Sequence, residues 1–441
     1  MSFLLLALLA ALVGQRLAPW WVSEDDGRLF RWALATVAGL LLLFLALSTL
    51  TLLGIPWSRA SVLIAWMVPG LLLGAWVRRS EAVPIAPGRP WSWAELVAVA
   101  ALVVLAGVAL QGWSVHPDFI YHWGIKAEKD FLARGFDFDF RSKPWNIVRH
   151  PDYPNFLPGL DATTALFAGR FDTRSMLLGS VLAAALVLVA ARETLLRASG
   201  SWFWPRAALA ALALAAGTFG VGFLTLGGAD GLVALAPLLA APALLAPGRG
   251  RADAQLGLAA AFAAASKVEG IPLGAFLGLA YLARRGRGWV RSLPWLALPP
   301  ALVVGVWFLE ARRHGLFVES RGGWPSFTYL GATLRTVVET ALSPEWHGSA
   351  LLLLAWPLLW FSARARPLAW VTGLQALFYL YVYLSFPSDS VDTAIYLVRS
   401  NGARLLFHLF PTVVLGLGLV LSGWFEPSQK AESAPGSAVS R

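Results

Sequence analysis

The residues best suited to chemistry lie in four segments that are far apart along the chain. Each segment places acidic or basic side chains beside glycine, proline or aromatic residues, within 118–158, 227–230, 267–270 and 404–411. Carboxylates such as Asp118, Asp152 and Asp230 could take up a proton or hold Mg²⁺ or Mn²⁺. Lys267 and Arg404 could bind an anion. Ionisable side chains that interrupt long apolar stretches are costly, so we treat them as functional candidates.

The composition limits what can position these residues. Of the 441 residues, 58% are hydrophobic and 14% are charged, against about 45–50% and about 25% in soluble domains. This excess excludes a soluble enzyme, a disordered regulator and a secreted disulfide scaffold. It leaves an all-α polytopic membrane protein, because unpaired backbone groups are too costly in lipid for other open structures. The apolar runs are continuous rather than alternating, which disfavours a β-barrel. Without cysteine, the chain has no disulfide or thiolate.

Thirteen apolar windows are candidate membrane crossings, judged against the roughly 20 residues that span a bilayer core. The first lacks a preceding Lys or Arg, so it is interpreted as a retained helix and not a signal peptide. Two windows, 254–266 and 270–283, are short and could form a half-crossing pair or one bent unit. The windows are 3–14, 33–54, 60–77, 94–113, 175–192, 204–224, 231–246, 254–266, 270–283, 292–309, 349–362, 367–386 and 403–424.

The net charge of +10 indicates topology here and not a nucleic-acid partner. With the crossings alternating, nineteen Lys or Arg residues fall on one side and four on the other, once the long loops 114–174 and 310–348 are left out. Basic residues accumulate in cytoplasmic loops, so this bias predicts an outside N-terminus and a cytoplasmic C-terminus. The N-terminal helices would occupy 1–113, the core 175–425 and a disordered cytoplasmic tail 426–441. The predicted external segments are 114–174, 225–230, 266–269, 310–348 and 387–402.

The first external loop has the richest polar content. Its stretch 118–134 predicts an amphipathic helix lying at the membrane interface. Asp118 stands at the start of this helix, where a carboxylate could cap free backbone N–H groups or could do chemistry. His116, His122 and His150 lie in the same loop without the spacing of a zinc site, and the two His-Pro pairs favour turns.

These segments together resemble the GT-C superfamily of integral-membrane glycosyltransferases, which includes protein O-mannosyltransferases and the lipid A aminoarabinose transferase. A bacterial branch carries Asp, Trp and Lys-Ala in its first loop, followed by His-Pro-Asp-Tyr-Pro. The matching residues are Asp118, Trp123, Lys126-Ala127 and 150–158. Three further motifs of the branch are similar to 227–230 (GGAD), 267–270 (KVEG) and 404–411 (RLLFHLFP). Gly228 and Val268 replace the Tyr and Asn of that pattern.

The resemblance implies transfer of a sugar from a polyprenyl-phosphate donor to a glycan, lipid or protein hydroxyl, outside the bacterial inner membrane. It implies an Asp118 general base and inversion at the sugar carbon. The implied catalytic set is Asp118, Asp230 and Asp152, which would also be the ligands of any Mg²⁺ or Mn²⁺. The implied donor-phosphate set is Lys267, Arg404 and Lys126, and the supporting set is Trp123, His150, Tyr153, Glu269 and His408.

Several alternatives stay open at this point. Arg404 could snorkel to the interface, Glu269 could simply neutralise Lys267, and Asp230 could serve the dipole of its helix. The chain could instead be a flippase or transporter for a lipid-linked saccharide, an O-antigen ligase or polymerase type of enzyme, or a non-catalytic scaffold. A cytoplasmic nucleotide-sugar donor is disfavoured, because the sequence has no GxGxxG, P-loop or nucleophile elbow.

Overall fold

The protein is described from a computed structural model, and every regular element among the described residues is helical. The described residues are 2–77, 91–112, 118–143, 150–198, 203–218, 226–248, 251–316, 324–344, 349–386, 388 and 390–425. The predicted tail 426–441 lies outside them.

The N-terminal half forms long helices separated by one group of short ones. The long helices are α1 (Ser2–Leu17), α2 (Arg28–Leu52), α3 (Arg59–Val77), α4 (Trp93–Gln111), α8 (Thr173–Ala198) and α9 (Phe203–Thr218). Between α4 and α8 lie a π-helical turn, Phe119–Trp123, and the helices α5 (Gly124–Ala133), α6 (Phe138–Ser142) and α7 (Phe156–Ala168).

The C-terminal half continues the bundle. Its elements are α11 (Asp230–Leu245), α12 (Ala252–Ser266), α13 (Gly270–Arg285), α14 (Trp289–Arg313), α15 (Leu330–Ala341), the 3₁₀ helix η5 (Ser349–Phe361), α16 (Arg366–Ser385) and α17 (Val391–Phe425). Short 3₁₀ turns at Ala18–Trp20 and Gly286–Gly288 follow α1 and α13.

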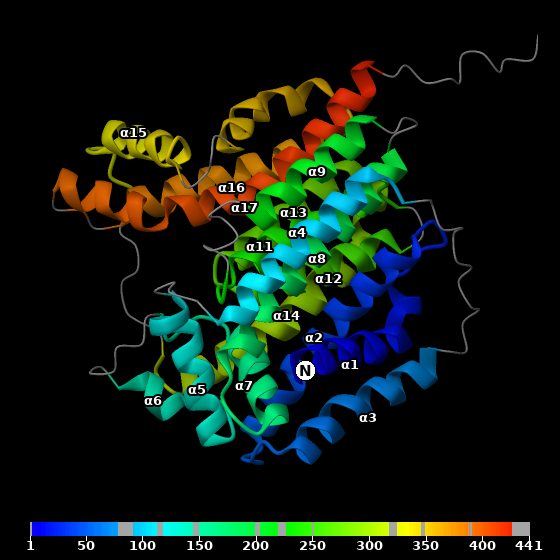
Figure 1. The fold of residues 1–441 in the computed structure, drawn as a ribbon, viewed down its shortest axis with the longest axis vertical. Helices are drawn as coiled ribbons and strands as arrows, with labels where there is room; N and C mark the ends of the chain where they lie inside the picture. The colour runs from blue at the N-terminus through cyan, green and yellow to red at the C-terminus, as the bar shows by residue number, and fades with distance from the viewer. Residues whose placement is uncertain are drawn as a thin grey trace, which may run out of the picture.

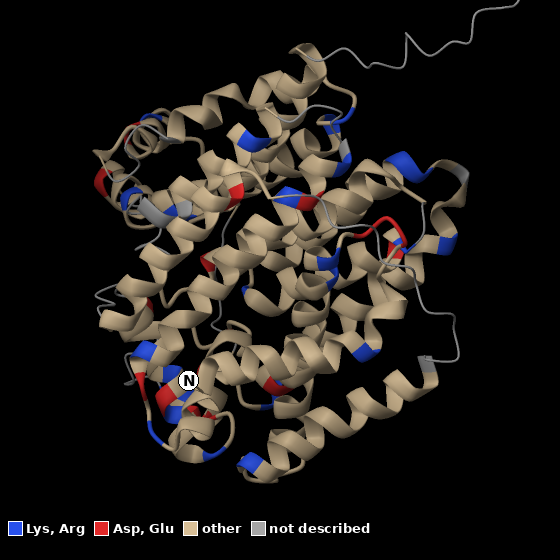
Figure 2. Ribbon diagram, turned by 45° about the vertical axis from the view of Figure 1, so that its right-hand side comes forward, with Lys and Arg blue, Asp and Glu red and all other residues tan. Residues whose placement is uncertain are grey.

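Each of the thirteen predicted windows coincides with a helix. Among the described residues, eight helices are long and apolar enough to cross a membrane: α1, α2, α3, α4, α8, α14, α16 and α17. The chain therefore has the architecture of a polytopic helical membrane protein. The helices α9, α11, α12, α13 and η5 are shorter, so thirteen crossings stay a prediction. Figure 2 shows long stretches of helix without charged residues, which gather mainly at helix ends and connections.

The helices α11 and α12 form the centre of the bundle, and nearly all their residues are buried. Their Ala-rich and Gly-containing sequence lets neighbouring backbones approach closely. A Cβ on Gly257 would lie 1.9 Å from the carbonyl oxygen of Trp295, and one on Gly270 would lie 1.8 Å from that of Ala263. Small residues thus fix the close approach of α12 to α14 and α13.

The predicted loops contain more helix than the sequence indicated. Segment 114–174 holds α5, α6 and the largely buried α7, which group together at one end of the bundle, the lower left of Figure 1. The predicted helix at 118–134 is confirmed as the π-helical turn followed by α5. The prediction of a loop at 387–402 is wrong, because α17 begins at Val391. Segment 310–348 contains the end of α14 and the whole of α15.

Candidate functional site

Asp230 is the centre of a buried ionic cluster at the external end that the sequence predicts. It is the first residue of α11 and is only 1% exposed. Its Oδ1 accepts from Lys267 Nζ at 3.0 Å and lies 2.8 Å from His408 Nε2. Its Oδ2 lies 4.0 Å from Arg404 Nη1. A carboxylate with three such partners is held strongly in its ionised form.

Lys267 reaches Asp230 from the turn between α12 and α13. The turn closes tightly, because Gly270 N donates to the Lys267 carbonyl at 2.9 Å. Lys267 Nζ also lies 3.5 Å from Glu269 Oε1, and Tyr153 OH donates to that same oxygen at 2.9 Å. The predicted Lys267–Glu269 pair is therefore present, but the shorter contact is with Asp230. Glu269 connects the cluster to segment 114–174, the predicted first external segment.

Arg404 and His408 come from one face of α17, since residues four apart lie one above the other on a helix. His408 is fully buried between Asp230 and Tyr379, whose hydroxyl lies 2.6 Å from His408 Nδ1. Gln375 Nε2 donates to that hydroxyl at 2.7 Å, so the tyrosine proton is free to be donated to Nδ1. This network assigns the imidazole proton to Nε2, which then donates to Asp230.

Asp118 joins the cluster through an ion pair between its Oδ2 and Arg404 Nη1. Its side chain makes no capping hydrogen bond, so the interpretation of Asp118 as a helix cap is wrong. The side chain of Arg404 is 12% exposed and is directed into the cluster. Its Nη2 donates to Asn401 Oδ1.

A glycine turn brings the first and second motifs together. Gly227 has a φ of +78°, and a Cβ there would lie 2.5 Å from the ring of Phe119. Its N–H donates to Ser180 Oγ on α8 at 2.9 Å. Because Phe119 follows Asp118, we expect the packing of its ring on Gly227 to position Asp118 relative to Asp230.

The structure thus brings together residues from all four predicted motifs. We call Asp118, Asp230, Lys267, Arg404 and His408 the Asp230 cluster. Glu269 and Tyr153 border it, as the preceding contacts show. The described contacts of four other candidates lie outside the five cluster residues: Asp152, Lys126, Trp123 and His150. The rings of His150 and Trp123 reach the bordering Tyr153, with centroids 4.6 and 6.1 Å from its ring.

Those contacts stabilise the first external segment. Lys126 is fully buried, and its Nζ donates to the His150 carbonyl at 2.5 Å. Trp123 is buried against the ring of His122, with centroids 4.0 Å apart. His150 has a φ of +52°, and its carbonyl also accepts from Tyr153 N at 3.2 Å. This confirms the predicted turn at His150 and favours a structural role for Lys126.

The same segment contains other buried titratable groups. Burial lowers the pKa of the His122 imidazole well below its usual range, with a further contribution from the charge of Lys126. Arg141 Nη2 donates to both oxygens of Asp130 at 2.6 Å, and both side chains are fully enclosed. Burial raises the pKa of the Asp130 carboxyl to about 6, although Arg141 opposes this effect. Lys126 and Asp130 of α5 are therefore buried, whereas Glu128 on the same helix is exposed.

The carboxylates do not form a metal site. Among the residues that the structure describes, no group of three or more His, Asp or Glu side chains is arranged to hold a metal ion. Asp230 is bonded to Lys267 and His408, and Asp118 is paired with Arg404. The backbone carbonyl of Asp152 accepts from Trp307 Nε1 at 2.9 Å. Because both carboxylate oxygens of Asp230 and Oδ2 of Asp118 face basic side chains of the protein, these two residues do not fit Mg²⁺ or Mn²⁺.

An apolar cavity of about 470 Å³ adjoins the cluster, lined by α15, η5, α16 and α17. Tyr379 lines this cavity and bonds to His408, so the cavity reaches the edge of the charges. A much smaller cavity of about 40 Å³ lies on another face of α17, between Phe407, Gly227 and the buried Asp161. Different residues of α17 thus line each of the two cavities, while Arg404 and His408 belong to the Asp230 cluster.

Sequence reasoning missed several residues that shape this site. Tyr379 and Gln375 lie within an apolar helix and carry no motif, although polar side chains in such a helix are a usable signal. Asn401 belongs to a segment that was predicted as a loop. Phe119 and Ser180 contribute through packing and a backbone contact, which sequence alone does not reveal.

Comparison with known proteins gives no family assignment: no protein-family model, no curated protein and no solved structure matches this chain.

Proposed function

We propose that the protein is a membrane glycosyltransferase of the GT-C type, which transfers a sugar from a polyprenyl-phosphate donor to a hydroxyl acceptor. The observation that carries the proposal is the meeting of four distant motifs in the Asp230 cluster, beside the apolar cavity of about 470 Å³. The reaction would occur at the external face of a bacterial inner membrane. The acceptor would be a glycan, a lipid or a protein.

The site has one part suited to each end of such a donor. The lining of the large cavity is almost wholly apolar and suits an isoprenoid chain. Lys267 and Arg404 suit the phosphate, because an ammonium and a guanidinium form charge-assisted hydrogen bonds with phosphate oxygens. Asp230 is the shared partner of both cations, which supports a positioning role for it and not a role as base.

Asp118 is the best-placed base in this proposal. Its side chain is 15% exposed, whereas that of Asp230 is 1% exposed. The acceptor oxygen would form a bond to the anomeric carbon while the bond from that carbon to the phosphate oxygen breaks. The acceptor proton would go to Asp118, and the electron pair of the broken bond would leave with the phosphate. A base opposite the leaving group gives inversion.

One observation favours a second candidate function. An O-antigen ligase or polymerase type of enzyme would depend on Arg and His in a large late external loop and not on Asp118; here an Arg and a His, Arg404 and His408, join the cluster from the helix α17. The two functions differ in one comparison of variants. In the ligase type, His408→Gln would abolish transfer and Asp118→Asn would retain it. In the GT-C type, Asp118→Asn would abolish transfer.

The proposal is tested most directly in the cell that makes the protein. Deleting the gene should cause a polyprenyl-phosphate sugar to accumulate and one envelope glycan, glycolipid or glycoprotein to lose that sugar. Mass spectrometry of extracted lipids and released glycans measures both changes. Unchanged profiles of both would overturn the proposal.

The donor-binding assignment makes a kinetic prediction. Lys267→Gln and Arg404→Gln should each raise the donor KM about tenfold with a smaller effect on kcat, because a contact made equally in the ground and transition states changes KM alone. Initial rates at varied donor concentration measure this. An unchanged donor KM in both variants would refute the assignment.

The proposed topology can be tested with introduced cysteines, since the native chain has none. An impermeant maleimide added to intact cells should label Ser142→Cys, in the first external segment, and should not label Gly288→Cys. Labelling of Gly288→Cys and not of Ser142→Cys would mean that the four motifs do not lie on the external face.

A further inference from the structure

The Asp118–Arg404 ion pair brings together two residues that the proposed function needs for different tasks. Arg404 is needed for the donor phosphate and Asp118 for the acceptor proton, yet the two are paired in the structure. A carboxylate beside a guanidinium is a weaker base, because the opposite charge favours its ionised form. The paired state is therefore poorly prepared for both tasks.

The pair forms the accessible edge of the cluster. The side chains of Asp118 and Arg404 are 15% and 12% exposed, whereas those of Lys267 and Asp230 are 6% and 1% exposed. An anion that approaches the cluster from solvent or from the membrane would meet this edge first.

Arg404 would keep its place if Asp118 were displaced. Its Nη2 donates to Asn401 Oδ1, and its Nη1 lies 4.0 Å from Asp230 Oδ2. Asn401 is itself fixed by donating to the Leu397 carbonyl at 3.3 Å and to Ser400 Oγ at 3.0 Å. The guanidinium can thus exchange one anionic partner for another without moving far.

We propose that the Asp118–Arg404 pair is a latch that the donor phosphate opens. The phosphate competes with Asp118 for Arg404, and its binding releases the Asp118 carboxylate to act as the base. This inference rests on the proposed function and adds an order to it: the donor binds first, and the acceptor is activated only afterwards. No covalent bond changes when the latch opens.

The latch makes a prediction that runs against the usual effect of mutating an active site. Asp118→Asn removes the competing charge, so it should bind an isoprenyl monophosphate about tenfold more tightly than the native protein. The probe is geranylgeranyl phosphate, and the assay is calorimetric titration of the purified full-length protein in lipid nanodiscs. Asp118→Ser provides a second neutral variant should Asp118→Asn fail to fold.

Two controls distinguish competition between Asp118 and the phosphate for Arg404 from simple repulsion of the phosphate by Asp118. Asp139→Asn removes one negative charge from an exposed position in the same external segment, so it should leave binding unchanged. In an Arg404→Gln background the gain from Asp118→Asn should disappear, because coupled residues are non-additive. If the gain persists in that background, Asp118 only repels the phosphate and the latch is refuted.

Two further outcomes of the binding assay test the latch and the proposed function. Equal or weaker binding by both neutral variants at position 118 would overturn the latch while leaving the proposed function intact. Failure of every variant and of the native protein to bind geranylgeranyl phosphate would contradict the proposed function itself.

Discussion

Two buried clusters of charge occupy opposite ends of α12, and their chemistry is similar. One is the Asp230 cluster, next to the end of α12 where Lys267 follows. The other, which we call the Asp26 cluster, comprises Asp26, Arg31, Glu193, Arg197 and Gln255. Gln255 and Lys267 are twelve residues apart, which is roughly 18 Å along a helix. Each cluster joins segments that are distant in the sequence.

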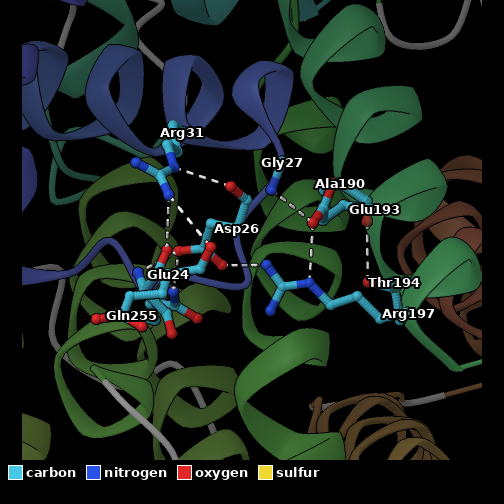
Figure 3. Close-up of polar contacts among 10 residues, drawn as sticks. Glu24, Asp26, Gly27, Arg31, Ala190, Glu193, Thr194, Arg197 and Gln255 are labelled. Atoms are coloured by element: carbon cyan, nitrogen blue, oxygen red, sulfur yellow. Dashed lines mark hydrogen bonds and ion pairs between the residues drawn. The ribbon is translucent and has the colours of Figure 1, made fainter. Parts of the chain in front are cut away.

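The clusters differ in where their polar groups point. In the Asp26 cluster the side chains bind one another and the nearby backbone, as Figure 3 shows. Asp26 Oδ2 accepts from Ser23 N at 2.6 Å and from Gln255 Nε2 at 2.8 Å, and its Oδ1 pairs with Arg197. Arg31 Nε donates to the Asp26 carbonyl at 2.8 Å. These contacts connect the α1–α2 turn to α8 and α12.

The Asp230 cluster instead adjoins two cavities. The comparison teaches that buried ion pairs alone do not identify a functional site. Both clusters are costly to bury and both need good geometry. What distinguishes the candidate site is the apolar cavity at its edge.

The largest expected effect is on turnover and comes from Asp118→Asn. Asn keeps the shape of the side chain but cannot take up the acceptor proton, so kcat should fall about 10²–10⁴-fold. The transfer rate and the thermal unfolding temperature of the purified variant are measured together. Near-normal turnover would show that Asp118 is not the general base. The proposed functional difference between the two clusters would then lose its main support.

Asp26→Asn should have the opposite pattern. It leaves Arg197 with Glu193 as its remaining described carboxylate partner, and breaking a buried pair costs about 3–5 kcal/mol. Thermal unfolding in detergent should show this loss, while the transfer rate per folded molecule stays near the native value. A stable Asp26→Asn protein with impaired transfer would show that the second cluster also serves function.

The sequence predicted the fold in its coarse form. Apolar windows located every long helix because continuous apolar stretches of sufficient length have few other stable structures in lipid. Element boundaries near polar residues were less predictable. The sequence between the apolar windows 367–386 and 403–424 was predicted as a loop at 387–402, but α17 begins at Val391 and packs against α15. Buried α7 was missed because it lies within a polar segment.

The sequence predicted the members of the site better than their contacts. Asp118, Asp230, Lys267 and Arg404 were selected from the four sequence motifs, and they meet in one cluster. The partner of each could not be predicted, because pairing depends on how distant helices pack. Lys126 shows the limit of such reasoning: the GT-C resemblance implied phosphate binding, yet the described hydrogen bond of Lys126 is with a backbone carbonyl.

The Asp130–Arg141 pair sharpens the comparison, because it lies in the first external segment but is as enclosed as Asp26. The pKa of Asp130 in the folded protein is about 6, above its ordinary value of 3.8. The folded state therefore binds the Asp130 proton more tightly than the unfolded state does. The stabilisation that this proton gives the folded state is present at low pH and is lost as the pH rises through about 6. The difference between the two pKa values corresponds to about 3 kcal/mol in the free energy of unfolding.

The stability advantage of the native protein over Asp130→Asn should consequently shrink by up to about 3 kcal/mol between about pH 4 and about pH 7. Thermal unfolding of both proteins across this range measures the change. A pH-independent difference would show that Arg141 holds Asp130 ionised throughout.

The smallest effects come from one glycine beside each cluster. Gly27 has a φ of −64°, and a Cβ there would lie 2.5 Å from Glu193 Oε2, the flexible end of a side chain. Gly27→Ala should therefore cost about 1 kcal/mol or less and leave turnover unchanged. Gly227 has a φ of +78°, and its new Cβ would meet the ring of Phe119. Gly227→Ala should cost roughly 1–2 kcal/mol from the backbone alone.

Gly227→Ala should also reduce turnover by about tenfold or more, because displacing Phe119 moves the adjacent Asp118, and small misplacements of a catalytic group are costly. Gly54→Ala is the matched control: its φ is +66°, but a Cβ there would meet nothing within 4 Å. It should show a similar loss of thermal stability with normal turnover. Equal turnover in the Gly54→Ala and Gly227→Ala proteins would mean that the contact between Phe119 and Gly227 does not position the base.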